Sequence, residues 1–462
     1  MSRCWNISFD DGTLVLRGAT LEELPVRGFR WDHRVEALRG PADSYSSIIY
    51  HALSTAQSAN PIVVNDGAKN WRKLDNLTPD SRVERVPRQY QEEAVQAWLE
   101  NLRRGLIVLP TGSGKSYVAE LCILATSRPT LIIAPTLDLV GQWAERLHMA
   151  LGAEIGIIGG GFHQVQDITV TTYDSMYRHL PTYGDRFCLL IFDEAHHLPA
   201  PGYLEATKGS LAPYRLGLTA TPQREDGREQ LLDAAVGPVV YRREIHEMSG
   251  EFLADYEVVR VLVELTEDER QEYEKNRATY LQFLRNKGIN MSGGWRNFIR
   301  LAARSKDGRA AFVAHQRAKK IAHHAEEKKS VLAALLHQER HRKILIFTND
   351  NAMAYDLSCS FLLPCITHQT DIKERRYLIQ AFASGELPVL VTSRVLNEGV
   401  DIPSAEIAIV LAGTGTVREH VQRLGRILRP QPGKQAVLFE VVSANTTEEA
   451  TSYRRRRHDA YR

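Results

Sequence analysis

The stretch Leu106 to Ser116 reads LIVLPTGSGKS, an apolar strand that runs into a glycine-rich turn and then a helical segment. Glycines let the backbone turn tightly, so that its N–H groups face a polyphosphate at the helix N-terminus. We expect this loop to bind ATP, with the Lys115 ammonium on the β- and γ-phosphates and the Ser116 hydroxyl on Mg²⁺. The candidate nucleotide-binding residues are Thr111, Gly112, Ser113, Gly114, Lys115 and Ser116. The usual pattern has glycine where this chain has Leu109, so a plain turn with a surface lysine is the alternative on this motif alone.

A second apolar strand ends in two adjacent carboxylates, in the stretch LLIFDEAH from Leu189 to His196. We expect Asp193 to hold the Mg²⁺ shell and Glu194 to polarise the water that attacks the γ-phosphate. A solvated acidic strand end is the alternative, but it fits poorly beside a phosphate loop earlier in the same block.

Short apolar strands alternate with helical segments in two blocks, which predicts an α/β fold with parallel sheets. The predicted strands are 106–109, 130–134, 168–172, 189–192 and 215–219 in the first block, and 343–348, 389–392, 407–411 and 436–441 in the second. The segment 266–324 between the blocks has helical composition and reads as an insertion. A hairpin around Asp11-Gly12 and a helix from Asp43, with Ile48, Ile49, Ala52 and Leu53 on one face, predict a small α+β domain before a polar linker at 65–84.

The composition fits an intracellular globular protein. The 462 residues are 43 % apolar and 25 % charged, with a net charge of +2 that neither demands nor excludes a nucleic-acid partner. The five cysteines form no C-x-x-C pair, which argues against a disulfide framework or a cysteine-based metal cluster. No signal peptide or membrane-spanning run is visible, so we expect a cytoplasmic protein with no membrane partner.

The order of the motifs resembles that of superfamily 2 helicases, which have two RecA-like domains. This resemblance implies an adenine-side motif at Arg88 and Gln91, with Gln91 reading the base. It also implies backbone-gripping motifs at 134–136 and 171–174, and further motifs at 346–349 and 392–401. The residues expected to couple hydrolysis to domain movement are His196, Thr219, Thr221, Glu398, Gly399 and Asp401.

The segment QRLGRILR, residues 422–429, is similar to the arginine motif of these helicases. Its helix can present Arg426 and Arg429 to the γ-phosphate, with Gln422 as a further catalytic residue. Arginine suits this task because its fixed charge and forked donors stabilise the charge that spreads over a transferring phosphoryl group. A solvated basic face is the alternative for one such helix in isolation.

The sequence Arg224-Glu225-Asp226 is similar to the signature of the XPB family of DNA repair helicases, and the resemblance covers nearly the whole chain. It implies an N-terminal damage-recognition domain at 1–80 and RecA-like domains at 85–245 and at 250–265 with 325–445. A thumb at 266–324 and a basic tail at 446–462 complete the predicted organisation. The two carboxylates of the signature position Arg224 or wedge between DNA strands, unless the motif is only a surface turn.

The insertion supports a DNA partner independently of the resemblance. Ten basic residues and a single acid, Asp307, lie between Arg285 and Lys320. Arg296, Arg300 and Arg304 follow at helical spacing, which predicts a stripe that tracks phosphates, with Trp295 and Phe298 nearby. A solvated helical face is the alternative, and the same pair of interpretations holds for Arg454 to Arg457 in the tail.

We therefore expect a monomeric, ATP- and Mg²⁺-dependent DNA helicase or translocase of 3'-5' type that opens forked, bubble or duplex DNA in nucleotide excision repair. A different class is also open: an ATP-gated DNA clamp that recruits or regulates a partner nuclease and unwinds little by itself. A third hypothesis, an RNA-directed enzyme of the same superfamily, is disfavoured by the signature and the thumb.

Overall fold

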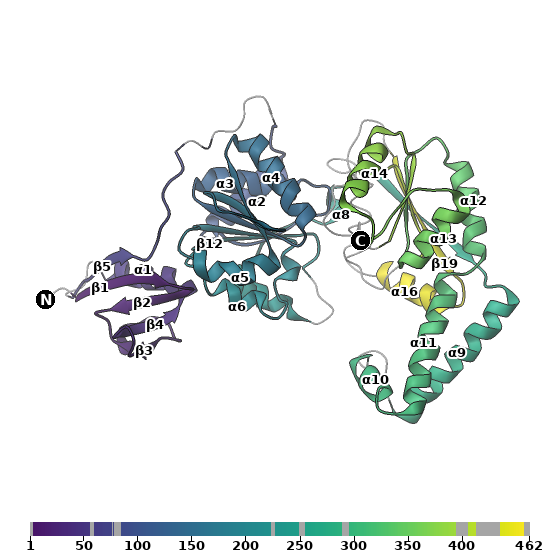
Figure 1. Ribbon diagram of the computed structural model, residues 1–462, viewed down its shortest axis with the longest axis horizontal. Coiled ribbons are helices and arrows are strands. Elements are labelled where there is room, and N and C mark those ends of the chain that lie inside the picture. Colours follow the sequence, from purple (N-terminus) through teal and green to yellow (C-terminus); the bar gives the residue numbers. More distant parts are fainter. Residues whose placement is uncertain are drawn as a thin grey trace. The chain divides into compact units, whose positions relative to one another are not determined.

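The computed structural model describes residues 3–55, 60–75, 77, 85–222, 227–248, 255–288, 295–393, 405–412 and 435–456. The chain forms two compact units that divide between Arg243 and Glu244. We describe the units separately; in Figure 1 the first runs from purple to teal and the second from teal-green to yellow. Among the helices of the described segments, none is long and apolar enough to cross a membrane.

A small α+β domain begins unit 1, as predicted. Its sheet has the strand order β3-β4-β2-β1-β5, antiparallel except for the parallel pair β1–β5. The strands are β1 (Arg3–Asp10), β2 (Thr13–Arg17), β3 (Arg30–Asp32), β4 (Ala37–Pro41) and β5 (Ile62–Gly67), and the helix is α1 (Tyr45–Ser54). The hairpin at Asp11-Gly12 is confirmed as β1 and β2.

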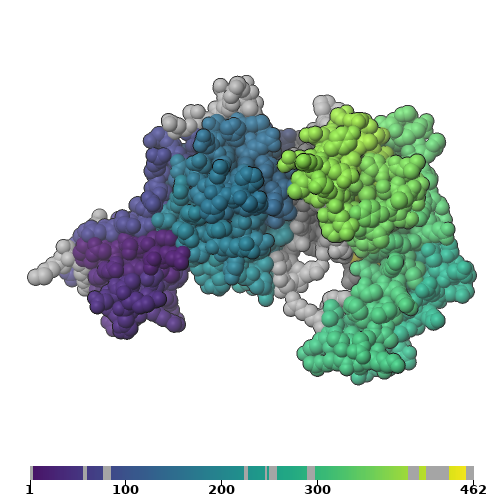
Figure 2. Space-filling view, viewed as in Figure 1, coloured from purple at the N-terminus to yellow at the C-terminus, as the bar shows by residue number. Residues whose placement is uncertain are grey.

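Two sequence-based predictions fail in this domain. The linker predicted from residue 65 starts too early, because β5 extends to Gly67 by pairing with β1 along its whole length. The apolar face predicted for α1 is only partly buried: Ile48 lies in the core, whereas Leu53 is 68 % exposed. The domain packs against the rest of unit 1, where the Asp43 N–H donates to the Lys208 carbonyl and Leu211 joins its core (Figure 2).

An eight-stranded sheet forms the second and larger domain of unit 1. Its order is β13-β6-β12-β11-β7-β10-β8-β9, and every neighbouring pair is parallel except β8–β9. The strands are β6 (Arg104–Val108), β7 (Thr130–Ala134), β8 (Ile155–Gly159), β9 (Phe162–Gln164), β10 (Ile168–Thr172), β11 (Leu189–Asp193), β12 (Tyr214–Thr219) and β13 (Val239–Arg242). All five strands predicted for this block are present, and β8, β9 and β13 were not predicted. The phosphate-loop strand β6 is separated from the acidic strand β11 only by β12.

Two helices of this domain begin at threonine caps, and two others begin after a glycine. The helices of the domain are α2 (Gln89–Glu100), α3 (Lys115–Thr126), α4 (Leu137–Leu151), α5 (Tyr173–Tyr183), α6 (Tyr203–Thr207) and α7 (Leu231–Ala235). Thr136 and Thr172 cap α4 and α5 by accepting from the N–H groups of Leu139 and Ser175. These two threonines belong to the predicted backbone-gripping motifs, so the structure places both motifs at helix starts along the carboxyl edge of the sheet.

Unit 2 carries a second sheet, in which all neighbouring strands are parallel. Its order is β14-β19-β18-β15-β17-β16. The strands are β14 (Asp255–Val263), β15 (Ile344–Phe347), β16 (Cys365–Ile366), β17 (Val389–Thr392), β18 (Ile407–Val410) and β19 (Gln435–Ser443). Its helices are α8 (Ile245–Met248), α12 (Glu327–Gln338), α13 (Asn351–Phe361) and α14 (Ile372–Ser384). The four strands predicted for this block are confirmed, and β14 joins them as the predicted segment 250–265 requires.

The insertion is helical, as predicted, and has its own core. It contains α9 (Glu267–Asn286), α10 (Trp295–Ala302) and α11 (Lys306–His323). The predicted arginine stripe is wrong in one respect: α10 ends at Ala302, so Arg304 lies in the turn before Ser305 caps α11. Phe298 packs inside the helical core instead of facing outward.

The predicted basic tail at 446–462 begins as a packed helix, α16 (Thr447–Arg456). Glu448 on this helix is buried and paired with the buried Lys328 of α12 at 2.8 Å, and Lys328 also donates to the Leu411 carbonyl at 2.6 Å. The side chains of Arg454 to Arg457 lie outside the described residues, so both interpretations of this basic run stay predictions.

Candidate active site

The phosphate loop of unit 1 has the backbone that a polyphosphate site requires. Gly112 and Gly114 adopt φ angles of +89° and +83°, which other residues rarely adopt. A Cβ atom on Gly114 would also lie only 2.8 Å from the Gln91 amide nitrogen. The turn directs the N-terminus of α3 outward, and the Lys115 ammonium donates to the carbonyls of Leu109 and Pro110 at 3.2 and 3.3 Å.

The predicted base reader Gln91 is turned toward the protein in this structure. Its amide oxygen accepts from the Arg88 N–H at 3.0 Å, and its amide nitrogen donates to the Ser113 carbonyl at 3.1 Å. The buried Tyr90 hydroxyl donates to the same carbonyl. Helix α2 therefore supports the phosphate loop directly, a role for Tyr90 that the sequence analysis missed.

The acidic strand places Asp193 in a fixed and buried position. Its carboxylate accepts from the Trp143 indole N–H at 2.8 Å and from the Glu194 N–H at 3.0 Å. Burial raises the pKa of Asp193, while the Trp143 hydrogen bond and the Lys115 charge oppose that rise. Trp143 was not predicted as a site residue, although its place on α4, after a predicted motif, could have suggested it.

A chain of contacts leads from Glu194 to the motif at 219–221. Glu194 has a φ of +46°, a strained backbone conformation of the kind that concentrates at functional sites. The His196 Nδ1 atom lies 3.4 Å from the Glu194 carboxylate and 3.2 Å from the Thr219 hydroxyl. The Thr219 hydroxyl in turn donates to the Thr221 carbonyl at 3.1 Å. The structure thus brings together three of the residues predicted to couple hydrolysis to movement.

The residues of unit 1 fit magnesium and a nucleotide triphosphate. The Thr111 hydroxyl is buried and has no hydrogen-bond partner among the described residues, which leaves a polar atom for a ligand in the loop. Lys115 would contact phosphate oxygens, and the Ser116 hydroxyl and Asp193 carboxylate are the hard oxygen donors that Mg²⁺ prefers. Within the described ranges, no group of three or more His, Cys, Asp or Glu residues could hold a metal ion.

Several predicted site residues lie outside the described residues. They are Arg224, Glu225, Asp226, Glu398, Gly399, Asp401, Gln422, Arg426 and Arg429. The side chain of Arg296 is likewise not described, whereas Arg300 and Arg304 are both exposed on the insertion.

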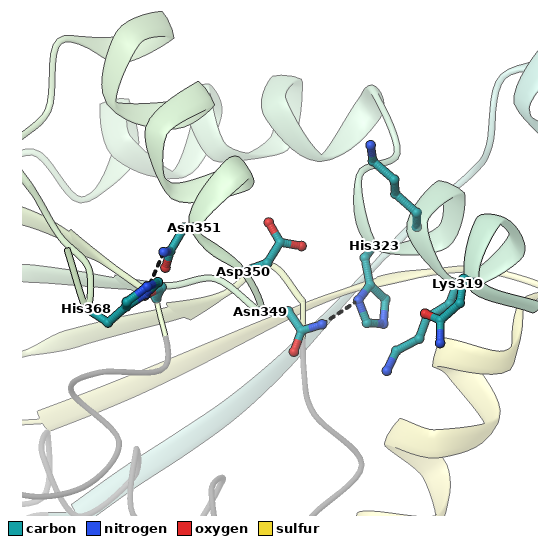
Figure 3. Close-up of a pocket in the computed structure, with 9 residues that line it drawn as sticks. Lys319, His323, Asn349, Asp350, Asn351 and His368 are labelled. Carbon is teal, nitrogen blue, oxygen red and sulfur yellow. Dashed lines mark hydrogen bonds between the residues drawn. The ribbon is translucent and has the colours of Figure 1, made fainter. Parts of the chain in front are cut away.

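In unit 2, a cavity of about 790 Å³ opens between the end of α11 and the loops that follow three strands of the sheet (Figure 3). Its lining residues are Gln316, Lys319, Lys320, His323, Asn349, Asp350, Asn351, His368 and Ser393. The predicted motif at 346–349 therefore reaches the cavity through Asn349, next to lysines of the insertion.

Two asparagines orient two histidines in this cavity (Figure 3). Asn349 contacts His323 Nδ1 at 3.1 Å, and Asn351 contacts His368 Nδ1 at 2.7 Å. Burial and neighbouring lysines lower the pKa of His323 to about 3, so this imidazole is neutral at pH 7. Because an amide NH₂ is a donor, Nδ1 of the neutral His323 ring accepts from Asn349, and Nε2 of that ring carries the proton. His323 follows lysines at the end of α11, a pattern typical of a helix surface, yet its side chain is buried.

Two parallel sheets, one with a phosphate loop and an Asp-Glu-Ala-His strand end, define the class of this protein: an ATPase motor of superfamily 2 helicase type. Matches to known families agree. Residues 84–224 match the type III restriction enzyme res subunit, residues 327–431 the helicase conserved C-terminal domain, and residues 7–57 the xeroderma pigmentosum group B helicase damage recognition domain.

The chain belongs to the XPB helicase family. It is 39 % identical to the DNA 3'-5' translocase XPB2 of Sulfurisphaera tokodaii over 95 % of this chain and 98 % of that protein. It is 30 % identical to the DNA 3'-5' helicase XPB of Mycobacterium tuberculosis, covering 76 % of this chain but only 60 % of that longer protein. Among solved structures, the Pyrococcus furiosus Hef helicase domain has the same fold, with a TM-score of 0.53, 20 % identity and coverage of 80 % of this chain and 98 % of that one.

Proposed function

We propose that this protein is an ATP-driven DNA translocase that opens or remodels duplex DNA during nucleotide excision repair, with 3'-5' polarity. Its membership of the XPB family and the match of its N-terminal domain to a damage recognition domain support this function. The observation that carries it most is the contact chain of Glu194, His196, Thr219 and Thr221, because it links the hydrolytic carboxylate to a second motif.

The residues of the chain divide the work as follows. Lys115, Ser116 and Asp193 hold Mg-ATP, which supplies the reactive phosphoanhydride when bound. Glu194 orients the attacking water and accepts its proton. Arg426 and Arg429 stabilise the charge that develops on the γ-phosphate, and Gln422 assists them, as their similarity to the arginine motif of helicases implies.

The second unit contributes DNA contacts in this proposal. The cavity of Figure 3 gathers Lys319 and Lys320 with the imidazole rings of His323 and His368, a set suited to backbone phosphates. The Arg224 signature and the exposed Arg300 and Arg304 provide further contacts, and Arg296 belongs to the same basic segment.

Measuring ATP hydrolysis with and without DNA tests the proposal. We expect stimulation by forked and bubble DNA, strand displacement on the same substrates, and loss of both in Lys115→Ala and Glu194→Gln proteins. Full ATPase activity in either variant contradicts the assigned roles. Stronger stimulation by matched RNA duplexes than by DNA would assign the enzyme to RNA instead.

The clamp hypothesis predicts a different result from the same protein. An ATP-gated clamp binds DNA tightly with ATP but displaces little strand until a partner nuclease is added. If the isolated monomer displaces strands as fast without a nuclease as with one, the clamp hypothesis is excluded.

A further inference from the structure

Two hollows meet at the seam between the N-terminal domain and the first motor domain, and they share Lys69 and Trp71. One, of about 390 Å³, is lined by aromatic and apolar side chains of α1 and by residues that lead into the motor strands. The other, of about 420 Å³, lies between residues 69–72 and the loops at Pro129, Asp167 and Arg186. We call the two hollows together the seam groove.

The seam groove lies away from the nucleotide site. Pro129, Cys188 and Pro213 immediately precede the parallel strands β7, β11 and β12, so the groove occupies the amino edge of the motor sheet. The phosphate loop follows the carboxyl end of β6, which is parallel to β12. Strands of five or six residues separate the two edges by roughly 15–20 Å. A ligand in the groove therefore contacts neither ATP nor the motifs at the carboxyl edge.

Two aromatic side chains of the groove, Tyr45 and Trp71, are held in place by contacts within unit 1. Trp71 packs edge-on against Tyr45 at a centroid distance of 5.8 Å, and the Tyr45 hydroxyl donates to the Asp66 carboxylate at 2.6 Å. The segment that carries Trp71 is tied to the motor domain because the Asn70 N–H donates to the Asp185 carbonyl at 2.9 Å. Beside this fixed pair, Tyr50 is 77 % exposed on α1.

The charges around these rings are mainly positive. The basic residues that line the groove are Lys69, Arg72, Arg128 and Arg186, and the single lining acid is Asp167. Asp167 is paired with Arg72 at 3.5 Å, and Lys69 is paired with Asp66 at 3.2 Å. Arg128 forms no ion pair with any residue in the described part of the chain, so its charge is available to an anion.

We propose that the seam groove binds unpaired nucleotides of single-stranded DNA, with a base against Tyr50 and Trp71 and a backbone phosphate on Arg128. Exposed aromatic faces beside basic side chains are the chemistry that binds single strands without regard to sequence. The proposal rests on DNA as the substrate, as argued above, and adds a second binding place that is independent of ATP. An acidic peptide would satisfy the basic residues but would leave the aromatic faces without a stacking partner.

Photocrosslinking of the full-length protein tests the proposal without nucleotide. The probe is oligothymidylate that contains 5-iododeoxyuridine, and crosslinked peptides are mapped by mass spectrometry. We expect crosslinks to residues 45–54 or 69–74 in the wild type and in Lys115→Ala, because the groove lies at the opposite sheet edge from the phosphate loop.

Two groove variants and two matched controls make the test specific. Tyr50→Ala and Arg128→Gln remove an exposed ring and an unpaired charge, and we expect each to lower the crosslink yield about tenfold. The controls are Tyr177→Ala and Arg178→Gln on α5, where Tyr177 is 53 % exposed and both residues lie outside the groove lining. Thermal unfolding of each variant shows that the fold is kept.

Crosslinks confined to other segments, or equal yields from Tyr50→Ala and Tyr177→Ala, overturn the proposal. So does displacement of the probe by polyglutamate as effectively as by unlabelled oligothymidylate, which would assign the groove to an acidic peptide. A protein with intact crosslinks but no DNA-stimulated ATPase would instead contradict the proposed motor function and leave the groove assignment standing.

Discussion

At the scale of single residues, the buried carboxylate of Asp193 shows how neighbouring donors oppose the effect of burial on an acidic group. Burial raises the pKa of this group, so the carboxylate depends on donors that favour the charged form. The Trp143 indole supplies one such donor from α4, a helix that begins at Thr136. The indole is therefore part of the active site although it touches no substrate.

We predict that Trp143→Phe lowers the ATP hydrolysis rate about tenfold at neutral pH, because a hydrogen bond to a charged group contributes roughly 1.5–3 kcal/mol. Loss of the N–H raises the pKa of Asp193 further, so the acidic limb of the pH–rate profile moves to higher pH. Steady-state ATPase assays across a pH series measure both effects. Trp98→Phe is the matched control, because the buried indole of Trp98 donates to the Arg215 carbonyl and not to Asp193. An equal shift of the acidic limb in this control contradicts the role given to Trp143.

A second prediction concerns the contribution of His323 to the pH dependence of the folding stability. Its pKa is lowered to about 3 in the folded protein, so the unfolded chain binds the proton more readily. Folding stability contributed by this residue is therefore complete above its unfolded pKa of about 6.5 and is lost as the pH falls toward 3. Between pH 7 and pH 5 this loss amounts to about 2 kcal/mol.

Replacement of His323 by Asn removes that part of the pH dependence. We expect the free energy of unfolding, measured by urea titration at pH 7 and pH 5, to fall less in His323→Asn than in the wild type by about 2 kcal/mol. His341→Asn, on an exposed turn, is expected to follow the wild type. Identical acid sensitivity of wild type and His323→Asn would show that His323 is not buried as a neutral ring.

At the scale of elements, α16 shows why charge pattern alone misleads. Its sequence is strongly polar, yet Glu448 is buried with Lys328, and the Ser443 N–H donates to the same carboxylate at 3.1 Å. The Thr447 N–H donates to the Tyr273 hydroxyl of the insertion at 2.8 Å. The helix therefore joins the insertion to the sheet of unit 2.

We predict that Lys328→Met destabilises the protein by about 3–5 kcal/mol, because it leaves the Glu448 charge buried without its partner. The double variant Lys328→Met with Glu448→Gln is expected to recover a large part of that loss. Lys329→Met is the control, because its pair with Asp356 is solvent-exposed and contributes at most about 1 kcal/mol. Chemical denaturation of the three proteins checks the order, and a double variant no more stable than the single one contradicts it.

The elements that the sequence predicts well are short buried strands rich in β-branched residues. Strands β7, β10 and β17 match the predicted bounds because Ile, Val and Thr, which favour strands, dominate them. The short strand β9 was missed because all three of its residues are exposed. Helical spacing also predicted that the arginine stripe continues beyond Ala302. This prediction was wrong because spacing carries no information about the Ser305 cap, at which the next helix begins.

The candidate site was predictable to a similar extent. The phosphate loop, Asp193, Glu194 and the contact between His196 and Thr219 follow from local motifs, and the structure brings these residues together. Tyr90 and Trp143 were not predictable because they reach the site from α2 and α4 only after tertiary packing. The meeting of Lys319 and Asn349 at one cavity was not predictable for the same reason, because the two residues lie on separate elements of unit 2.

At the scale of the whole molecule, the chemistry assigned to the chain is divided between its two units. The phosphate loop and the catalytic carboxylate lie in unit 1, whereas Arg426 and Arg429 belong to the stretch of sequence after β18 of unit 2. If the arginines act only on the transition state, their removal must slow ATP hydrolysis without weakening nucleotide binding. A motor needs hydrolysis to depend on both units, because the movement of the units can then time the reaction.

We predict that Arg426→Ala and Arg429→Ala bind a fluorescent ATP analogue within about twofold of the wild type but hydrolyse ATP about a thousandfold more slowly, since a catalytic arginine contributes on that scale to phosphoryl transfer. Lys115→Ala is expected to lose binding as well, because its ammonium contacts the ground-state phosphates. Arg423→Ala, on the same motif, serves as the charge-matched control and is expected to hydrolyse ATP within a few-fold of the wild type. Hydrolysis at the wild-type rate by the Arg426 and Arg429 variants would mean that unit 1 completes the reaction alone, so that ATP turnover and any movement of unit 2 are not obligatorily linked.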